Sequence, residues 1–252
     1  MDDMQRDDMI ADAHGPDAGW LAADYHIPST YSLRTPMSSM GSGLALPAPG
    51  PATVRLALVR TGIELFGEGY TRDVLFPAIR RAGIRVRPPE RVAISDQPQR
   101  AYKGVAASAG AITDYGALRE SLVYREMAHA HGTMTVYVEA SPAHADALGR
   151  ALMAVGYWGR ADSLAWCAGV RRGAPPRGEC ATPLSSMDAG RPLRPYVTTI
   201  VSEFDSGRVE WDDVMPSASG RRDAIRMDLY VWPLVVAARH DAGRVLHRRP
   251  LC

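Results

Sequence analysis

The alternation of apolar and polar residues predicts a chain built from both strands and helices. Residues 19–33 combine aromatic and β-branched residues as strands do, whereas the apolar residues of 52–67 cover most of a helical circumference, which is typical of a buried helix. Pro51 suits the first turn of that helix and Gly67 its end. The same patterns predict a helix over 71–83, a strand over 84–95, two hairpin strands within 119–140, a helix over 141–156 and a strand over 156–170.

The order of these elements is strand, helix, strand, strand, helix, strand. It predicts an α+β fold of the ferredoxin-like or RRM type, a βαββαβ unit with an antiparallel sheet and both helices on one face. We assign this domain to residues 18–170. A Pro-, Gly- and Arg-rich linker over 171–183 precedes a small C-terminal β-rich region over 184–252, in which 194–204 and 226–238 have strand-like patterns.

Two long segments of the predicted domain contain few bulky apolar residues. Residues 34–51 are rich in Ser, Gly, Met and Pro, and residues 96–117 are similarly poor in apolar side chains. Loops of this length inside a compact domain are uncommon, and they are usually either disordered or used for binding. We therefore expect either two solvated loops or two binding elements.

The composition is that of an ordinary globular protein. The chain has 252 residues, 46% of them hydrophobic and 23% charged, and it contains no run of about eighteen apolar residues that would predict a membrane span. Its three cysteines have no metal-binding spacing, which indicates a reducing, cytoplasmic environment. No P-loop and no HExxH motif is present, so we expect neither a cofactor nor a metal.

The net charge of +1 hides an asymmetry along the chain. Residues 1–17, which we expect to form an acidic disordered extension, carry six Asp and one Arg, so the remainder carries +6. Lys103 is the only lysine, and arginine is the cation that grips phosphate in two places and stacks on bases. Codon usage in a GC-rich genome would give the same bias. The charge therefore permits nucleic-acid binding without requiring it.

The sequence HAHG places His129 and His131 two residues apart, on one face if the segment is a strand. With Tyr124 nearby in the chain, they could act as general base and acid of an RNA-cleaving site, because histidine titrates near neutrality. They could equally be the polar tip of a hairpin or a subunit contact. Ser38, Ser39 and Ser42 lack a His/Asp partner pattern, so a serine hydrolase is not supported.

Several motifs resemble those of the Cas-five family, the CRISPR-associated RAMP proteins at the 5′ end of the guide RNA in class 1 effector complexes. A first strand is followed by a Ser/Gly loop and an entry into the helix through Pro47, Pro49 and Pro51. Later come GTMTVYVEA, a helix, and the sequence VGYWGRADSLAWC, with a Gly-x-x-Gly-Arg-x-Asp-Ser motif over 156–163. The resemblance covers roughly residues 20–170.

The resemblance implies a non-catalytic subunit that binds the 5′ handle of the CRISPR RNA. Its partners would be backbone RAMP subunits, a large or target-recognition subunit and, indirectly, target DNA. The 34–51 loop would wrap the RNA or a neighbouring subunit, and 96–117 would form a β-hairpin thumb. The expected RNA-binding residues are Arg34, Ser38, Ser42, Arg55, Arg100, Tyr102, Lys103 and Arg160.

Two alternatives remain open at this point. The first is a metal-independent endoribonuclease that processes precursor CRISPR RNA, using the histidines of HAHG. The second is a ferredoxin-like protein-interaction module that binds no RNA.

Overall fold

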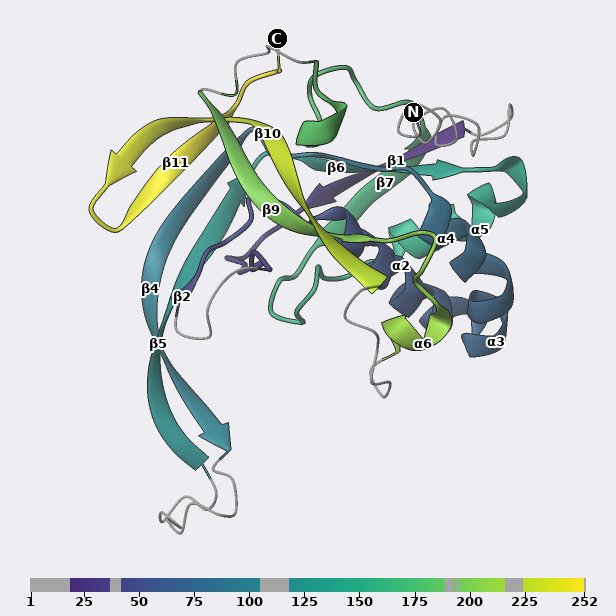
Figure 1. The fold of residues 1–252 in the computed structure, drawn as a ribbon, viewed down its shortest axis with the longest axis horizontal. Helices are drawn as coiled ribbons and strands as arrows, with labels where there is room; N and C mark the ends of the chain where they lie inside the picture. The colour runs from purple at the N-terminus through teal and green to yellow at the C-terminus, as the bar shows by residue number, and fades with distance from the viewer. Residues whose placement is uncertain are drawn as a thin grey trace, which may run out of the picture.

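The computed structural model describes residues 19–36, 42–104, 118–188, 193, 195–215 and 224–251, which form two β-sheets with helices packed against them (Figure 1). The structure is thus mixed α and β, as the sequence predicts. No helix within these ranges is long and apolar enough to cross a membrane.

The first sheet has four antiparallel strands in the order β3-β6-β1-β7, formed by Ile84–Arg87, Met134–Ala140, Gly19–His26 and Trp166–Arg172. Helices α2 (Pro51–Phe66) and α5 (Pro142–Met153) contact each other and pack on this sheet. Leu21, Ala23 and Tyr25, which share a face of β1, are buried, and the hydroxyl of Tyr25 donates a hydrogen bond of 2.6 Å to the carbonyl of Leu152 in α5. The face of the sheet that carries Tyr25 therefore packs against the helices.

The second sheet is built around the long strands β4 (Arg91–Gly104) and β5 (Leu118–His131). Within the described residues its order is β2-β5-β4-β11-β10-β8, and β9 also pairs with β10. The remaining strands are β2 (Ser42–Gly43), β8 (Thr182–Pro183), β9 (Tyr196–Phe204), β10 (Ile225–His240) and β11 (Gly243–Arg248). Because β11 pairs with β4, the C-terminal strands extend the sheet that the β4–β5 hairpin begins.

Helix boundaries agree with the capping residues of the sequence. Pro51 begins α2, and Gly67 ends it with a φ of 82°, a left-handed conformation that favours glycine. The predicted helix over 71–83 is less regular. It consists of a π-helical turn, η1 (Thr71–Leu75), followed by α4 (Phe76–Arg81), and the short helix α3 (Glu68–Tyr70) precedes both. The remaining short helices are η3 (Leu184–Ser186) and α6 (Trp211–Val214).

Several predicted strands differ from the observed ones. The residues predicted as one strand over 84–95 form two, because the chain leaves the first sheet after β3 and enters the second as β4, with a break at residues 88–90. Pro88 and Pro89 lack the N–H groups that a continuous strand would donate. The hairpin predicted within 119–140 is wrong, since β5 pairs with β4 whereas β6 pairs with β1 and β3. Of the strand predicted over 156–170, only the end is strand, because β7 begins at Trp166.

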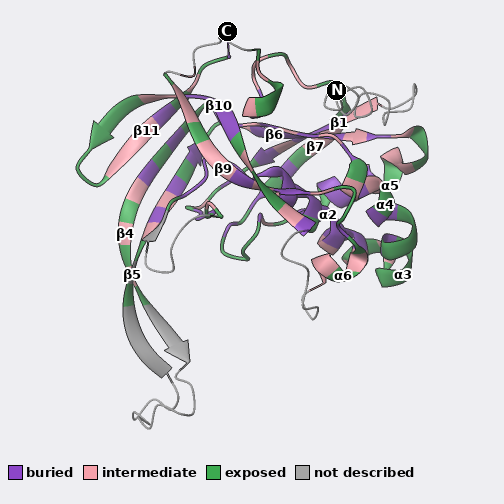
Figure 2. Ribbon diagram, viewed as in Figure 1, coloured by how far each residue is buried: buried purple, intermediate pink, exposed green. Residues whose placement is uncertain are grey.

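The buried side chains form a core that continues from the first sheet through α2 to the second sheet. Figure 2 shows buried residues concentrated along α2, and the main hydrophobic cluster contains residues of both sheets. Contacts of α2 reach α5 on one side and β9 on the other. The two sheets are therefore held as one packed body.

A buried ion pair lies where α2 meets the second sheet. The Nη1 of Arg55 is bonded to Glu203 of β9, while Nε and Nη2 donate to the carbonyls of Ile79 and Ala82 at 3.1 and 2.7 Å. Burial lowers the pKa of Arg55 and raises that of Glu203, because both charges are removed from water, and their mutual attraction opposes both shifts. The pair thus joins three elements at a desolvation cost that the hydrogen bonds offset.

Replacing Glu203 with Gln should lower the free energy of unfolding by about 3–5 kcal/mol, because it leaves the guanidinium of Arg55 buried without a counter-charge. Urea denaturation followed by circular dichroism measures the change. The double variant Arg55→Met with Glu203→Leu should recover part of the loss, since no buried charge then remains. Arg72→Ala, which breaks an exposed pair with Asp73, should leave the denaturation midpoint where it is; an equal loss in Arg72→Ala and Glu203→Gln would contradict the assignment.

Candidate nucleic-acid interface

The Ser/Gly/Pro segment after the first strand is closed at its base by backbone hydrogen bonds. The amide of Leu46 donates to the carbonyl of Leu33 at 2.6 Å, and the amide of Thr35 donates to Leu44 at 3.0 Å. Beyond Ala45 the chain is buried as far as the start of α2. The expectation that the whole 34–51 segment is an open loop is therefore wrong for 45–51, because its Ala, Leu and Pro side chains pack into the core.

The surface part of this segment lies beside the hairpin. Ser42 and Gly43 of β2 pair in parallel with Tyr124 and Arg125 of β5. Ser42 is thus placed by its backbone at the hairpin base, whereas Ser38 lies outside the described residues. The close pairing of β2 with β5 brings the Ser/Gly segment and the hairpin to one edge of the second sheet.

Glu126 fixes this junction. Its side chain accepts a hydrogen bond of 2.7 Å from the amide of Ala45 and two from Arg244 of β11, at 2.6 and 3.0 Å. Glu126 is only 5% exposed, so these charge-assisted bonds replace the water that its carboxylate would otherwise bind. One carboxylate therefore joins the loop, β5 and β11.

The Gly-x-x-Gly-Arg motif forms a tight turn between α5 and β7. Trp158 is buried and packs edge-on against Tyr25 with ring centroids 4.9 Å apart. Gly159 follows with a φ of 68°, and the amide of Arg160 bonds back to the carbonyl of Trp158 at 2.8 Å. Because Trp158 anchors the turn in the core, Arg160 is held exposed at its surface, 3.4 Å from Asp162.

Three arginines from distant segments gather where this turn meets the loop. A Cβ on Gly159 would lie 3.3 Å from Cδ2 of Leu33, so the turn that carries Arg160 packs against the residue that precedes Arg34. The pKa of Arg125 on β5 is lowered first by burial and then by the positive charges of Arg160 and Arg34. We call Arg34, Arg125 and Arg160 the arginine cluster.

The arginine cluster has the chemistry of an anion receptor. Guanidinium groups stay charged at neutral pH, so Arg160 and Arg34 repel the charge of Arg125. The carboxylate of Asp162 acts in the opposite direction and raises the pKa of Arg125. A phosphate placed among the arginines would relieve that repulsion and accept bidentate hydrogen bonds. Sequence reasoning named Arg34 and Arg160 but missed Arg125, because only the β2–β5 pairing places it beside them.

The β4–β5 hairpin projects away from the rest of the protein (Figure 1). Residues 96–104 belong to β4, so this part of the predicted thumb is a hairpin strand and not a loop, and 105–117 lie outside the described residues. Leu122 and Tyr124 of β5 are 58% and 56% exposed. The register pairs Leu122 with Arg100, which is also exposed, and Tyr124 with Pro98.

The other predicted hairpin residues are placed by backbone register. Tyr102 pairs with Glu120 and Lys103 with Arg119 near the end of the described hairpin. For these residues the structure describes the backbone and not the side chains. Tyr124 is the aromatic residue whose exposure the structure establishes on this hairpin, and sequence reasoning had considered it only beside the histidines.

Arg55 does not belong to this interface. It is 6% exposed, and its guanidinium is bonded to Glu203 and to two backbone carbonyls inside the protein. The expectation that Arg55 contacts phosphate is therefore wrong. Its place in a helix that is apolar on most sides was the sign that it would be buried.

His129 and His131 are exposed and lie on one face of β5 near its end. The described residues contain no group of three or more His, Cys, Asp or Glu side chains that could hold a metal ion. The pair is thus accessible to solvent, on a part of β5 opposite Ala93 and Arg91 of β4.

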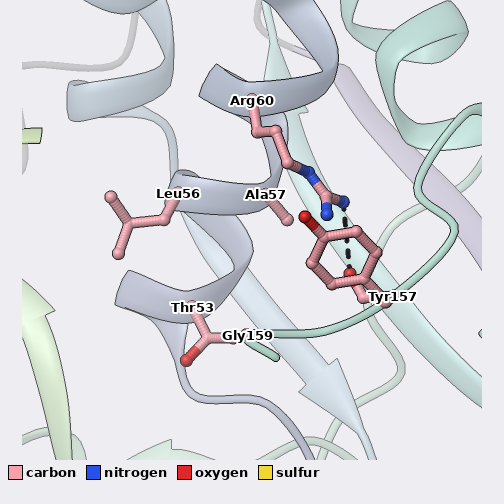
Figure 3. Close-up of a pocket in the computed structure, with 6 residues that line it drawn as sticks. All are labelled: Thr53, Leu56, Ala57, Arg60, Tyr157 and Gly159. Atoms are coloured by element: carbon pink, nitrogen blue, oxygen red, sulfur yellow. Dashed lines mark hydrogen bonds between the residues drawn. The ribbon is translucent and has the colours of Figure 1, made fainter. Parts of the chain in front are cut away.

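A small pocket adjoins the arginine cluster (Figure 3). It has a volume of about 140 Å³ and lies between α2 and the turn that carries Arg160. Its lining residues are Thr53, Leu56, Ala57, Arg60, Tyr157 and Gly159. Gly159 therefore lines the pocket, while the next residue in the chain, Arg160, belongs to the arginine cluster.

No protein-family model matches the chain. Among curated proteins, the CRISPR-associated protein Cas5 of Archaeoglobus fulgidus is 38% identical over 76 residues, which are 30% of this chain. The chain matches only about a third, 33%, of the length of that relative. The relative carries the name of the Cas-five family, so the resemblance inferred from the sequence motifs is confirmed.

Two solved structures align along most of the chain. They are a crystal structure of a CRISPR protein from Archaeoglobus fulgidus, with a TM-score of 0.43, 12% identity and 92% of each chain covered, and a CRISPR RNA-guided surveillance complex, with a TM-score of 0.34, 12% identity and coverage of 92% of this chain and 91% of that chain. These TM-scores are too low for either likeness to carry an argument.

Replacing Glu126 with Gln should loosen the junction, because an amide cannot accept the three hydrogen bonds that the carboxylate accepts. We expect a loss of about 1–3 kcal/mol in the free energy of unfolding and faster hydrogen exchange at the amide of Ala45, measured by mass spectrometry. Glu68→Gln, at an exposed position, is the matched control. Unchanged exchange at Ala45 in Glu126→Gln would show that the carboxylate does not hold the loop.

Proposed function

We propose that this chain is a Cas5-type subunit of a class 1 CRISPR effector ribonucleoprotein and that it binds the 5′ handle of the guide RNA. The observation that carries the proposal is the convergence of Arg34, Arg125 and Arg160 beside the base of a projecting hairpin. The name of the curated relative, CRISPR-associated protein Cas5, supports the same assignment.

We propose that the first sheet with α2 and α5 is the ferredoxin-like core expected of such a subunit. In support, both strand–helix–strand connections skip one strand: β6 lies between β1 and β3, and β1 lies between β6 and β7. This is the split βαβ arrangement. In our proposal, the second sheet then extends from this core to carry the hairpin as a thumb.

The proposed RNA contacts divide into two kinds. The arginine cluster would bind phosphates, while the exposed surface of Tyr124 and Leu122, with Arg100 opposite, would receive bases. Stacking of a base on an aromatic side chain contributes about 1–3 kcal/mol. Tyr102, Lys103, Ser38 and Ser42 remain candidate contacts on the same hairpin and loop.

We propose that the subunit is not itself a nuclease. His129 and His131 share a face of β5 with Arg125, but they lie four and six residues further along the strand, opposite Ala93 and Arg91 of β4. In this view the histidines contact a neighbouring subunit or solvent. The partners we propose are the guide RNA, backbone RAMP subunits and a large or target-recognition subunit, with target DNA contacted indirectly.

Alanine at Arg34, Arg125 or Arg160 should weaken binding to single-stranded repeat RNA. For single strands the slope of log affinity against log salt is about −0.7 per phosphate contact, so each substitution should reduce its magnitude by about 0.7. Fluorescence anisotropy over a salt series measures both effects. Arg72→Ala removes an arginine from the exposed π-turn and should leave the slope unchanged. A flat salt response of the unmodified protein would favour the protein-interaction module instead.

Incubation of the purified protein with repeat-containing RNA should leave the RNA intact on a denaturing gel. Cleavage that is lost in His129→Ala or His131→Ala, but kept in the control His144→Ala on α5, would establish the endoribonuclease alternative. Cleavage kept in all three variants would point to a contaminating nuclease.

A further inference from the structure

The pocket between α2 and the Gly159 turn has the size of one six-membered ring. Its volume is about 140 Å³, close to that of an engineered apolar cavity of about 150 Å³ that binds benzene. A single aromatic or heteroaromatic ring fits such a space. The pocket therefore has room for one small ring.

The walls offer both apolar contact and hydrogen-bonding groups. Leu56 and Ala57 provide apolar surface, and Thr53 provides a hydroxyl (Figure 3). At the far end the guanidinium of Arg60 stacks on the ring of Tyr157, 3.4 Å from its centroid, and donates to the carbonyl of Tyr157 at 3.3 Å. These are the features of a site that takes a flat ring with polar edges.

Arg60 leaves two donors unsatisfied beside the pocket. Its Nε and Nη1 are shielded from solvent and make no hydrogen bond within the part of the chain that the structure describes, and the carboxylate of Glu64 lies 3.8 Å from Nε. Buried donors without acceptors are rare in native proteins. A carbonyl oxygen on the edge of a bound ring, after a small rotation of the guanidinium, would satisfy them.

Gly159 connects the pocket to the arginine cluster. It lines the pocket, and Arg160 follows it directly in the chain. An RNA strand with a phosphate bound among the arginines can thus place an adjacent ring in the pocket. A small ring with carbonyl groups, attached to a phosphate, is a pyrimidine nucleotide.

We infer that this pocket admits one unstacked pyrimidine base of the RNA whose backbone the arginine cluster holds. The inference rests on the proposed function and adds a base preference to it. Leu56 lies at the mouth, 38% exposed, and forms one wall. The turn at Gly159 forms the opposite wall, and a glycine there keeps the entrance free of a side chain.

The test is a set of adenosine oligonucleotides of equal length, each carrying a single uridine at a different position. Their affinities for the full chain are measured by fluorescence anisotropy. Binding should strengthen about fivefold or more when the uridine occupies one particular position, as expected for capture of one base. Leu56→Trp, whose indole would fill the mouth, should abolish this preference while the salt slope of binding stays unchanged.

Leu65→Trp is the matched control, because Leu65 lies on the same helix, is 41% exposed and does not line the pocket. It should keep the uridine preference. Thr53→Val, which removes the hydroxyl and preserves the shape, provides a second variant should Leu56→Trp fail to fold, and it should reduce the preference. Circular dichroism checks the fold of each variant.

The outcomes separate the pocket from the proposed function. RNA binding without a uridine preference, or a preference that survives in Leu56→Trp, overturns the pocket inference and leaves the proposed function standing. Leu56→Trp could instead keep RNA binding and the uridine preference but lose association with another protein. That result overturns the pocket inference, because the pocket would then receive a side chain of the other protein. Absence of salt-dependent RNA binding by the unmodified chain overturns both.

Discussion

The buried carboxylate of Glu126 is the constraint on which the candidate interface depends. It accepts hydrogen bonds from the amide of Ala45 and from both terminal nitrogens of Arg244, so it joins the Ser/Gly loop, β5 and β11 at one point. With this junction fixed, Arg125 stays beside the loop that carries Arg34. Because the buried carboxylate of Glu126 needs hydrogen-bond donors, its contacts determine where Arg34 and Arg125 lie at the surface.

A second buried charge aligns the two sheets. Arg55 of α2 bonds to Glu203 of β9 and to carbonyls at the end of α4, which holds the helix between the sheets. Because α2 also forms one wall of the small pocket, the same packing determines where the pocket lies relative to the arginine cluster. The surface features therefore depend on polar contacts made in the core.

The structure separates residues that chemical type alone groups together. Arg34, Arg55 and Arg160 were equivalent candidates for phosphate binding in the sequence, yet two of them gather with Arg125 and the third is buried. Similarly, residues 96–104 belong to a strand of the projecting hairpin rather than to a loop, and within 96–100 every second residue is exposed. Exposure and pairing, which decide both cases, depend on partners far away in the chain.

The sequence by itself determined the local features: the ends of α2 at Pro51 and Gly67, the helix after Ser141, and the mixture of strands and helices. These depend on capping, backbone conformation and periodicity within a few residues. Only the tertiary structure decided that β5 pairs with β4 and not with β6, and that the C-terminal strands extend the same sheet. Strand pairing is non-local, because any strand with the right alternation can pair with several others until the whole core is packed.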